Sequence, residues 1–407
     1  MANKDPFSLL DHAKGVRIQD IVGFVKLGIT FAPGKLWKRR HPDIWVVSEY
    51  ADDARDNGYW FFRYLREQHP EIEAYYPIHR NSSDYKKLIG LSNVVEFGSI
   101  KHYLLFWASH IYAGTTKMDG FPSVLSCDFL HIRGLTSFKY VFLNHGVARG
   151  YSEITDGNRT NYEALIAISK REKETIVTLN NQPEEKVHAI GFCRHDNLDD
   201  KLLEKNLILY MPTWRTWLDV TKARKKKDRE RMVQEYLSSE YYQNCQGLIN
   251  NPKLIRYLED NNLHFILYLH EHAQEYSQYL TSSTKNITIA HKEDYFVQDL
   301  LKRAAFLITD YSSIIFDYAY MKKPCCYFQY DAEQFAREQY AESEFFTYER
   351  DGFGPIYTTQ DQVINAIVAS HAEGFLMDKK YRQRVEEYFP SFDKQHCQRT
   401  YELIRQL

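Results

Sequence analysis

The 407-residue sequence has no long apolar run, no excess of one charge and no cysteines at CxxC spacing. A membrane-spanning helix needs roughly 20 apolar residues, which no stretch approaches, and the first residues carry no secretory signal pattern. With 52 Lys and Arg against 54 Asp and Glu, the chain lacks the basic footprint of a nucleic-acid-binding protein. Its six cysteines form no CxxC pair, which is typical of a reducing compartment. We expect a cytoplasmic protein with no nucleic-acid partner.

Metal ligation is not predicted either. His270 and His272 flank Glu271 behind an apolar run, and alternate side chains of a strand would place the two histidines on one face. No third ligand follows at a suitable spacing. We therefore expect no metal site, and nothing in the sequence calls for a cofactor.

Alternating strand and helix patterns begin at Ile44. In the first half, apolar strand candidates are followed by helical stretches, at residues 44–50, 73–78, 138–146 and 162–179. A second series begins near Leu207, with strand candidates at 206–215, 264–272, 286–290, 306–313 and 323–330. This alternation is the signature of parallel sheets covered by helices. The sequence predicts an α/β protein with two Rossmann-like domains, at residues 41–199 and 200–407, that face each other across a cleft.

Residues 1–40 differ from the rest. Apolar residues recur there at helical spacing, namely Ile18, Ile21, Val22, Val25 and Ile29, and a Pro-Gly break then precedes a cluster running from Trp37 to Arg40. An amphipathic helix bounded by a Trp and cations is suited to an anionic membrane surface. The alternative is a helix packed on the protein's own core, because amphipathicity alone does not separate the two.

Polar residues gather where the predicted strands end. They form four groups: Asn144 to Gly146, Pro212 to Arg215, His270 to His272 and Asp310 to Ser313. Ligands of parallel sheets bind outside the carboxyl ends of the strands, so these groups are the candidate site. His145 precedes Gly146, which permits a close backbone approach.

Ser312 and Ser313 come directly before a predicted helix. Hydroxyls and unpaired N–H groups at that end of a helix can bind phosphate. The alternative is that one serine simply caps the helix, with Asp310 as a capping acid or turn former. The motif alone decides neither.

Taken in order, these motifs resemble the CDP-glycerol:poly(glycerophosphate) glycerophosphotransferases, the teichoic acid polymerases and primases. "DARDNGYWFFRYL" with Asp56 and Asn57, "NHG", "GFCRHDNL", "MPTWR", "LHEH" and "ITDYSSIIFDYAYMKKP" follow the family's order. Val147 stands where the family usually has Thr, and Glu271 where it has Pro. "GPI" near residue 355 and the spacing from Asp393 to Arg399 complete the series.

The resemblance implies a fold of the GT-B type and transfer of glycerol phosphate or ribitol phosphate from a CDP-activated donor to a hydroxyl, with release of CMP. It implies a lipid-linked polyol-phosphate or glycan acceptor, and a peripheral position on the cytoplasmic face of the cell membrane. His145 and His270 are then catalytic, with His145 as the base. The implied donor-phosphate group is Arg215, Thr213, Asp310, Ser312, Ser313 and Arg399, and the implied acceptor or cleft residues are Asp56, Asn57 and Gly146.

Two other functions fit the same pattern. A GT-B glycosyltransferase that uses a nucleotide sugar shares the two domains and a phosphate-binding helix end. A non-catalytic membrane scaffold of a wall-polymer complex would bind no nucleotide. The product released from each donor class distinguishes the three.

Overall fold

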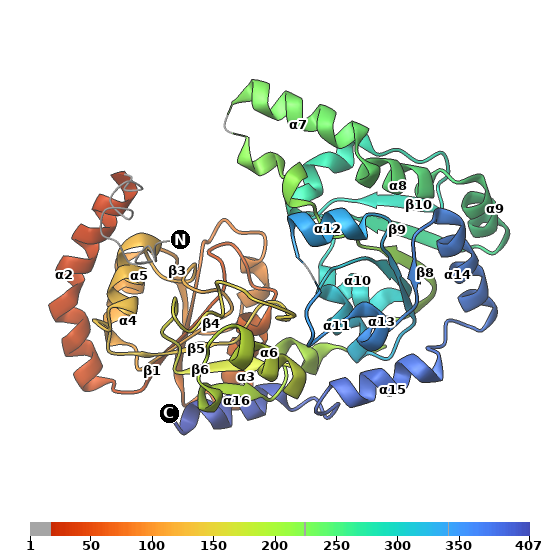
Figure 1. Cartoon of the computed structure of the whole chain (residues 1–407). Helices are drawn as coiled ribbons and strands as arrows, with labels where there is room; N and C mark the ends of the chain where they lie inside the picture. The colour runs from red at the N-terminus through yellow and green to blue at the C-terminus, as the bar shows by residue number, and fades with distance from the viewer. Residues whose placement is uncertain (1–17, 224, 341) are drawn as a thin grey trace. The chain divides into compact units, whose positions relative to one another are not determined.

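The computed structural model describes residues 18–223, 225–340 and 342–407, and the chain forms two compact units (Figure 1). Unit 1 runs to Asn197 and is completed by Pro390–Leu407, and unit 2 is Leu198–Phe389. The predicted boundaries differ, because they placed residues 390–407 in the second domain. Those residues form a helix that packs on unit 1, where Tyr401 lies 6.0 Å from the Trp45 ring.

Unit 1 is built on a parallel sheet. Among the described residues it has seven strands in the order β3-β2-β1-β4-β5-β6-β7. The strands are β1 Ile44–Ser48, β2 Glu73–Ile78, β3 Val94–Glu96, β4 Ile111–Gly114, β5 Lys139–Phe142, β6 Ala164–Ala167 and β7 Val187–Ala189. The sequence order reverses between β1 and β4, which is the switch point where Rossmann-like sheets bind ligands.

Helices and short 3₁₀ turns connect these strands. They are α2 Ile18–Arg40, α3 Asn57–Gln68, η1 Tyr85–Leu88, α4 Ile100–Ala108, α5 Val124–Ile132, α6 Lys170–Leu179, η2 Glu184–Lys186, η3 Cys193–Asn197 and α16 His396–Arg405. The core is largely aromatic: Phe121, for example, lies 4.9 Å from Tyr112 and 5.8 Å from Phe138 between ring centroids. The apolar side chains of the strands pack against those of the helices in one buried cluster.

The helix α2 packs along α4 (Figure 1). Its buried stripe includes Leu27 and Thr30, and the indole N–H of Trp107 donates to the Leu27 carbonyl at 3.1 Å. Gly34 lies so close to Trp107 that an added Cβ would come within 2.6 Å of it. This face of α2 therefore packs on the protein's own core, as the alternative predicts. The predicted Pro-Gly break is wrong, because the helix continues through Pro33.

The other side of α2 is also apolar. Ile21, Val22, Phe24, Val25, Ile29, Phe31 and Leu36 are each about half exposed or more. The single apolar stripe of an amphipathic helix is not confirmed, since apolar side chains lie on both sides. Trp37 is partly buried beside Tyr75, and Lys38 donates to the carbonyls of Ser109 and Ser137. Residues 1–17 of the predicted membrane segment lie outside the described part of the chain.

Unit 2 repeats the architecture of unit 1. Its parallel sheet has the order β10-β9-β8-β11-β12-β13 among the described residues. The strands are β8 Glu204–Tyr210, β9 His264–Tyr268, β10 Ile287–Ala290, β11 Ala304–Thr309, β12 Cys325–Phe328 and β13 Ile356–Tyr357. The sequence order again reverses, here between β8 and β11, and the predicted α/β class with two parallel sheets is confirmed.

The helices of unit 2 cover both faces of its sheet. They are α7 Lys226–Ser238, α8 Glu240–Ile249, α9 Pro252–Asp260, α10 Val297–Arg303, α11 Ile314–Tyr320, α12 Ala332–Glu338, α13 Tyr348–Asp351, α14 Gln360–Ala372 and α15 Lys379–Tyr388. The described residues of this unit also form the 3₁₀ segments η4 Thr216–Leu218, η5 Val220–Lys222 and η6 Glu271–Tyr279. Within the described ranges, no helix has both the length and the apolar character needed to cross a bilayer.

Candidate active site

His145, the predicted base, forms a dyad with an aspartate from another loop. It follows β5, and Asp56 caps α3 by accepting the Asn57 N–H at 2.7 Å. Nδ1 of His145 lies 2.5 Å from Oδ2 of Asp56. A carboxylate on Nδ1 holds the imidazole in the tautomer whose basic nitrogen is Nε2. The His145 side chain is 66% exposed, so it is accessible to a substrate.

Arg194 of η3 holds the second oxygen of the same carboxylate. Its Nη1 donates to Oδ1 of Asp56 at 2.6 Å and to the backbone carbonyl of His145 at 2.7 Å. The Asn57 amide oxygen accepts the Arg194 backbone N–H at 3.1 Å, and the amide nitrogen donates to the carbonyls of residues 143–144. Asn57 is therefore a link between loops, and Arg194 fixes both members of the dyad.

The charges of this cluster shift both dyad members. Burial alone would raise the pKa of Asp56, but Arg194 and His145 outweigh burial and lower it. The charge of Asp56 raises the pKa of His145, and partial desolvation of the ring by the surrounding loops opposes that effect only in part. Asp56 is thus an anion at neutral pH and makes the imidazole more basic than an isolated histidine.

A buried glutamate lies beneath the Asp56 loop. The carboxylate of Glu49, directly after β1, accepts backbone N–H groups from Arg55 at 2.9 Å, Asp56 at 3.0 Å and Tyr59 at 2.6 Å. Burial, together with the nearby charge of Asp56, raises the pKa of Glu49 to about 7. Glu49 shapes the turn that presents Asp56.

Glu172 supports the His145 loop in the same way. It accepts the backbone N–H groups of Ala148 at 2.8 Å and Ile168 at 2.7 Å, and burial raises its pKa to about 7. Asn144 donates to Glu172 at 3.3 Å and accepts the His145 N–H at 2.9 Å. Asn144 has φ 64°, a left-handed conformation that asparagine tolerates better than most residues. This geometry gives a local reason for asparagine at the position before His145.

In unit 2, Asp310 joins the ends of β8 and β11, the strands at the switch point. Its Oδ1 accepts the backbone N–H of Thr213 at 2.8 Å and the Thr213 hydroxyl at 2.5 Å. Its Oδ2 lies 2.9 Å from Nη1 of Arg215. Burial raises the pKa of Asp310, and Arg215 opposes that effect. Thr213 and Asp310 therefore hold two strand ends together.

Arg215 does not face solvent. Its side chain is 0% exposed, and Nε and Nη2 reach the two carboxylate oxygens of Asp331 at 2.7 and 3.0 Å. Aromatic rings surround the guanidinium, with Tyr241 5.0 Å and Tyr311 5.3 Å from it. As the side chain lies, it makes carboxylate contacts rather than the predicted phosphate contact, because two buried anions already balance its charge.

Ser312 and Ser313 are partly exposed at the start of α11. The Ser312 hydroxyl accepts the N–H of Ile314 at 3.3 Å, whereas Ser313 makes no side-chain capping bond. The helix has only seven residues, so its dipole contributes less to phosphate binding than that of a longer helix. Any phosphate contact here therefore depends mainly on the serine hydroxyls and the adjacent backbone N–H groups.

His270 lies at the end of β9 and is partly exposed. Its ring is parallel to that of His272, with 5.6 Å between centroids, and 6.0 Å from the Trp214 ring. The expectation that residues 270–272 continue the strand is wrong, because β9 ends at Tyr268 and a 3₁₀ helix begins at Glu271. Glu271 pairs with Lys292 at 3.0 Å, which balances the acid that replaces the family's proline.

Arg399, predicted as a donor ligand of the second domain, lies in unit 1. Its guanidinium donates to Asp393 at 2.8 and 3.1 Å, to Ser391 at 2.9 Å and to the Ile190 carbonyl at 3.2 Å. These bonds fasten the returning C-terminal segment to unit 1. The order of the motifs in the sequence groups Arg399 with Ser312 and Ser313, but it does not show that the chain crosses back to unit 1 at Pro390.

Gly146 follows His145 in the exposed loop and is itself partly exposed. Sequence reasoning gave no role to Arg194, Glu49 or Glu172. Arg194 lies in the motif "GFCRHDNL", so its position in a family motif could have marked it as a site residue. Neither spacing nor composition singles out Glu49 or Glu172. In the described part of the chain, no three His, Cys, Asp or Glu side chains are grouped to hold a metal ion.

Two parallel sheets with polar groups at their strand ends define a GT-B-like α/β protein. The structure of the wall teichoic acid polymerase TagF has the same fold, with a TM-score of 0.67 at 19% identity over 100% of this chain and 98% of that chain. The chain belongs to the CDP-glycerol:poly(glycerophosphate) glycerophosphotransferase family, whose model matches residues 35–406. The predicted family is thereby confirmed.

Curated relatives point to the same family. The chain is 28% identical over 374 residues to the minor teichoic acid biosynthesis protein GgaB of Bacillus subtilis (strain 168), covering 89% of this chain and 40% of GgaB. It is 24% identical over 339 residues to the teichoic acid poly(glycerol phosphate) polymerase of the same strain, covering 75% of this chain and 41% of that protein. The chain spans about two fifths of the length of these relatives.

Proposed function

We propose that this protein transfers a polyol phosphate, from CDP-glycerol or CDP-ribitol, to a hydroxyl of a lipid-linked polyol-phosphate or glycan acceptor in teichoic acid or capsule synthesis. Family membership supports the reaction class, and the Asp56–His145 dyad is the observation that carries the mechanism. A base beside an accessible surface is what attack by an alcohol requires.

In this mechanism the acceptor oxygen attacks the distal phosphorus of the donor pyrophosphate. Nε2 of His145 takes the hydroxyl proton, the new P–O bond forms, and the P–O bond to CMP breaks with its electron pair leaving on CMP. Asp56 stabilises the imidazolium that results, and Arg194 keeps Asp56 ionised and in place. Such transfers depend on positioning and electrostatic stabilisation of the phosphates.

The donor phosphates are assigned to unit 2. Ser313 supports this role because its hydroxyl makes no capping bond, and His270 because it lies partly exposed at the end of β9. Ser312 joins them as a second hydroxyl at the same strand end. Thr213, Asp310 and Arg215 act as positioning residues that hold the strand ends, and Arg399 as a clamp of the C-terminal segment.

The reaction class has a direct test. Purified protein is incubated with CDP-glycerol, CDP-ribitol or nucleotide sugars in the presence of a glycerol-phosphate-primed acceptor, and released nucleotides are separated by chromatography. CMP from a CDP-polyol, lost in His145→Ala, supports the proposal. If only the nucleotide sugars react and nucleoside diphosphate is released, the protein is a glycosyltransferase. If no nucleotide binds, the protein is a non-catalytic scaffold.

A peripheral position on an anionic membrane is part of the same proposal. The exposed apolar side chains of α2 support it, as do Arg39 and Arg40, which are exposed at the end of that helix. Single apolar residues on a surface are ordinary, whereas a contiguous set marks an interaction site. A membrane position would bring the enzyme to a lipid-linked acceptor.

Point variants test this better than truncation, because α2 also packs on α4. Val25→Asp with Ile29→Asp changes two residues that are 59% and 61% exposed, so the fold should tolerate it. Flotation with anionic vesicles should recover much less of this variant than of the unchanged protein. Ile89→Asp, at a residue 72% exposed elsewhere in unit 1, is the matched control. Equal recovery of all three proteins would contradict membrane binding through α2.

A further inference from the structure

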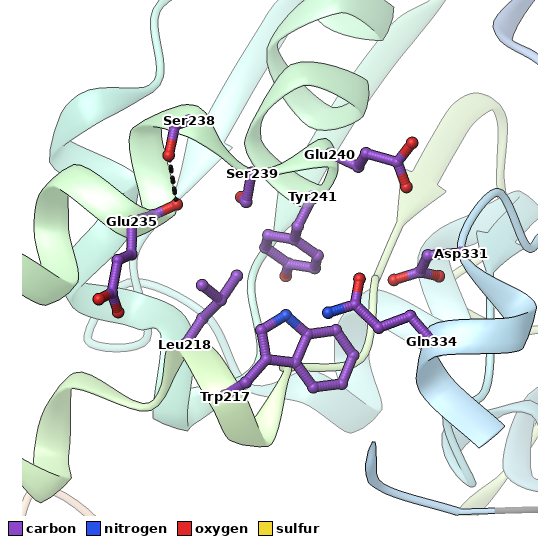
Figure 2. A pocket seen from close by; sticks show the side chains of 9 residues that line it. All are labelled: Trp217, Leu218, Glu235, Ser238, Ser239, Glu240, Tyr241, Asp331 and Gln334. Carbon is purple, nitrogen blue, oxygen red and sulfur yellow. Dashed lines mark hydrogen bonds between the residues drawn. The ribbon is translucent and has the colours of Figure 1, made fainter. Parts of the chain in front are cut away.

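Unit 2 contains a pocket of about 370 Å³ that the proposed reaction does not use. Figure 2 shows it between η4, the α7–α8 corner and α12. Its lining consists of Trp217, Leu218, Glu235, Ser238, Ser239, Glu240, Tyr241, Asp331 and Gln334. The volume lies at the lower end of the roughly 300–1,000 Å³ of small-molecule sites. It would hold one small ligand or one unit of a polymer.

A buried hydroxyl without a partner faces this pocket. Tyr241 is 3% exposed, and its hydroxyl has no hydrogen-bond partner in the described part of the chain. A buried polar group left unpaired costs free energy unless a ligand or water satisfies it. Figure 2 shows the Tyr241 ring directed into the space between Leu218 and Gln334. A ligand that reaches this hydroxyl would form a hydrogen bond that the protein itself leaves unmade.

The charge of the lining argues against a phosphate. Among the described residues that line the pocket, none is a Lys, Arg or His. Asp331 is balanced by Arg215 behind it, and Glu235 pairs only through an exposed contact of 3.5 Å with Arg231. Glu240, in the first turn of α8, adds another carboxylate. An anionic group placed here would meet net negative charge.

The remaining side chains suit a polyhydroxyl ring. The indole of Trp217 offers a flat apolar face and one N–H donor. Gln334 and the carboxylates of Glu235 and Glu240 supply donors and acceptors for hydroxyl groups. In Figure 2, Trp217 and Gln334 converge on the space below Tyr241. Apolar faces with a few convergent polar groups are how small-molecule sites combine affinity and orientation.

We propose that this pocket binds one sugar unit that carries no phosphate, with an amino sugar preferred because of the carboxylates. Ser312 and Ser313, the proposed donor-phosphate residues, are not among the residues that line the pocket, and its occupation requires no transfer chemistry. It gives the protein a glycan-binding function beside the proposed reaction.

Ligand-observed NMR with the purified full chain tests the proposal, using glucosamine, glucose, ribitol and glucose 6-phosphate as probes. We expect glucosamine and glucose to bind, glucosamine more tightly, and glucose 6-phosphate to bind at least tenfold more weakly than glucose. Saturating CDP-glycerol should not displace the sugars. Absence of binding by both sugars, equal binding of the phosphorylated sugar, or displacement by CDP-glycerol would each overturn the proposal.

Two conservative variants locate the binding. Tyr241→Phe removes only the unpaired hydroxyl and should weaken glucosamine binding about three- to tenfold, as expected for one hydrogen bond. Tyr236→Phe is the matched control, since the Tyr236 hydroxyl is also buried and unpaired but does not line the pocket. Equal effects of the two substitutions would place the sugar elsewhere and overturn the assignment. These binding measurements are independent of whether CMP is released from any donor.

Discussion

Nδ1 of His145 and Oδ2 of Asp56 lie 2.5 Å apart although 89 positions separate the two residues in the chain. Arg194, a further 49 positions beyond His145, bonds to both: to the carboxylate of one and the carbonyl of the other. Three loops at the carboxyl edge of one sheet thus form a single charged cluster.

Asp56→Asn should lower turnover roughly tenfold or more, and less than loss of the base itself, for which 10² to 10⁴ is typical. Because the charge of Asp56 raises the pKa of His145, the acid limb of kcat/KM should lie above pH 6.5 in the unchanged protein. In the variant it should move to lower pH. Asp52→Asn, an exposed acid of the same loop, is the control. If the acid limb of kcat/KM stays at the same pH in Asp56→Asn, Asp56 does not set the pKa of the catalytic base.

The two candidate histidines should behave differently. His145→Ala should leave donor affinity nearly unchanged and lower the single-turnover rate by about 10² to 10⁴. His270→Ala should weaken both donor binding and rate, since it lies in the same unit as Ser312 and Ser313. Donor affinity by calorimetry and single-turnover kinetics separate the two. A large loss of affinity in His145→Ala would make that residue a phosphate ligand instead.

Ser313→Ala tests the donor site with little risk to the fold, because Ser313 makes no capping bond. Loss of a hydrogen bond to a charged phosphate costs roughly 1.5 to 3 kcal/mol, which corresponds to about 10- to 150-fold in donor affinity. Ser312→Ala also removes the bond to the Ile314 N–H, so it should lower both affinity and stability. Unchanged calorimetric affinity in both variants would place the phosphates elsewhere.

Arg215→Met should act mainly on stability. It leaves Asp310 and Asp331 buried without their common partner, and breaking a buried pair typically costs about 3 to 5 kcal/mol. Urea unfolding followed by circular dichroism measures the loss. Arg256→Met, whose side chain is 85% exposed beside Asp260, should have almost no effect. If Arg215→Met unfolds at the normal urea concentration but binds the donor more weakly, Arg215 contacts the donor phosphate as the sequence predicts.

Glu172 should make stability depend on pH. Burial raises its pKa from 4.5 to about 7 in the folded protein, so the folded state binds this proton more tightly than the unfolded chain. The resulting stabilisation is present below pH 4.5 and is lost as pH rises through about 7. In Glu172→Gln the unfolding free energy should depend less on pH across that range. Glu174→Gln, an exposed acid of the same helix, should keep the original slope.

The α/β class, the family and most of the strand ends could be predicted from the amino-acid sequence. Strands such as β2, Glu73–Ile78, coincide with the apolar runs because a buried parallel strand needs apolar side chains on both faces. His145 could be singled out for the same reason: a polar group directly after such a strand has few uses except at a site. Apolar runs and the polar residues that follow them are short-range features, so the sequence shows them directly.

Which polar residues contact one another could not be predicted from the sequence and follows from the fold. Residues 390–407 return to unit 1 and take Arg399 with them, because α16 packs on the core beside Trp45 and no local pattern records that contact. Arg215 is held by Asp331, 116 positions further along the chain, and Arg194 by Asp56, 138 positions before it. Ion pairs of this kind depend on the order in which strands lie side by side in a sheet. Whether an arginine binds a substrate or a buried carboxylate is therefore a property of the fold, since the residue type is the same in both cases.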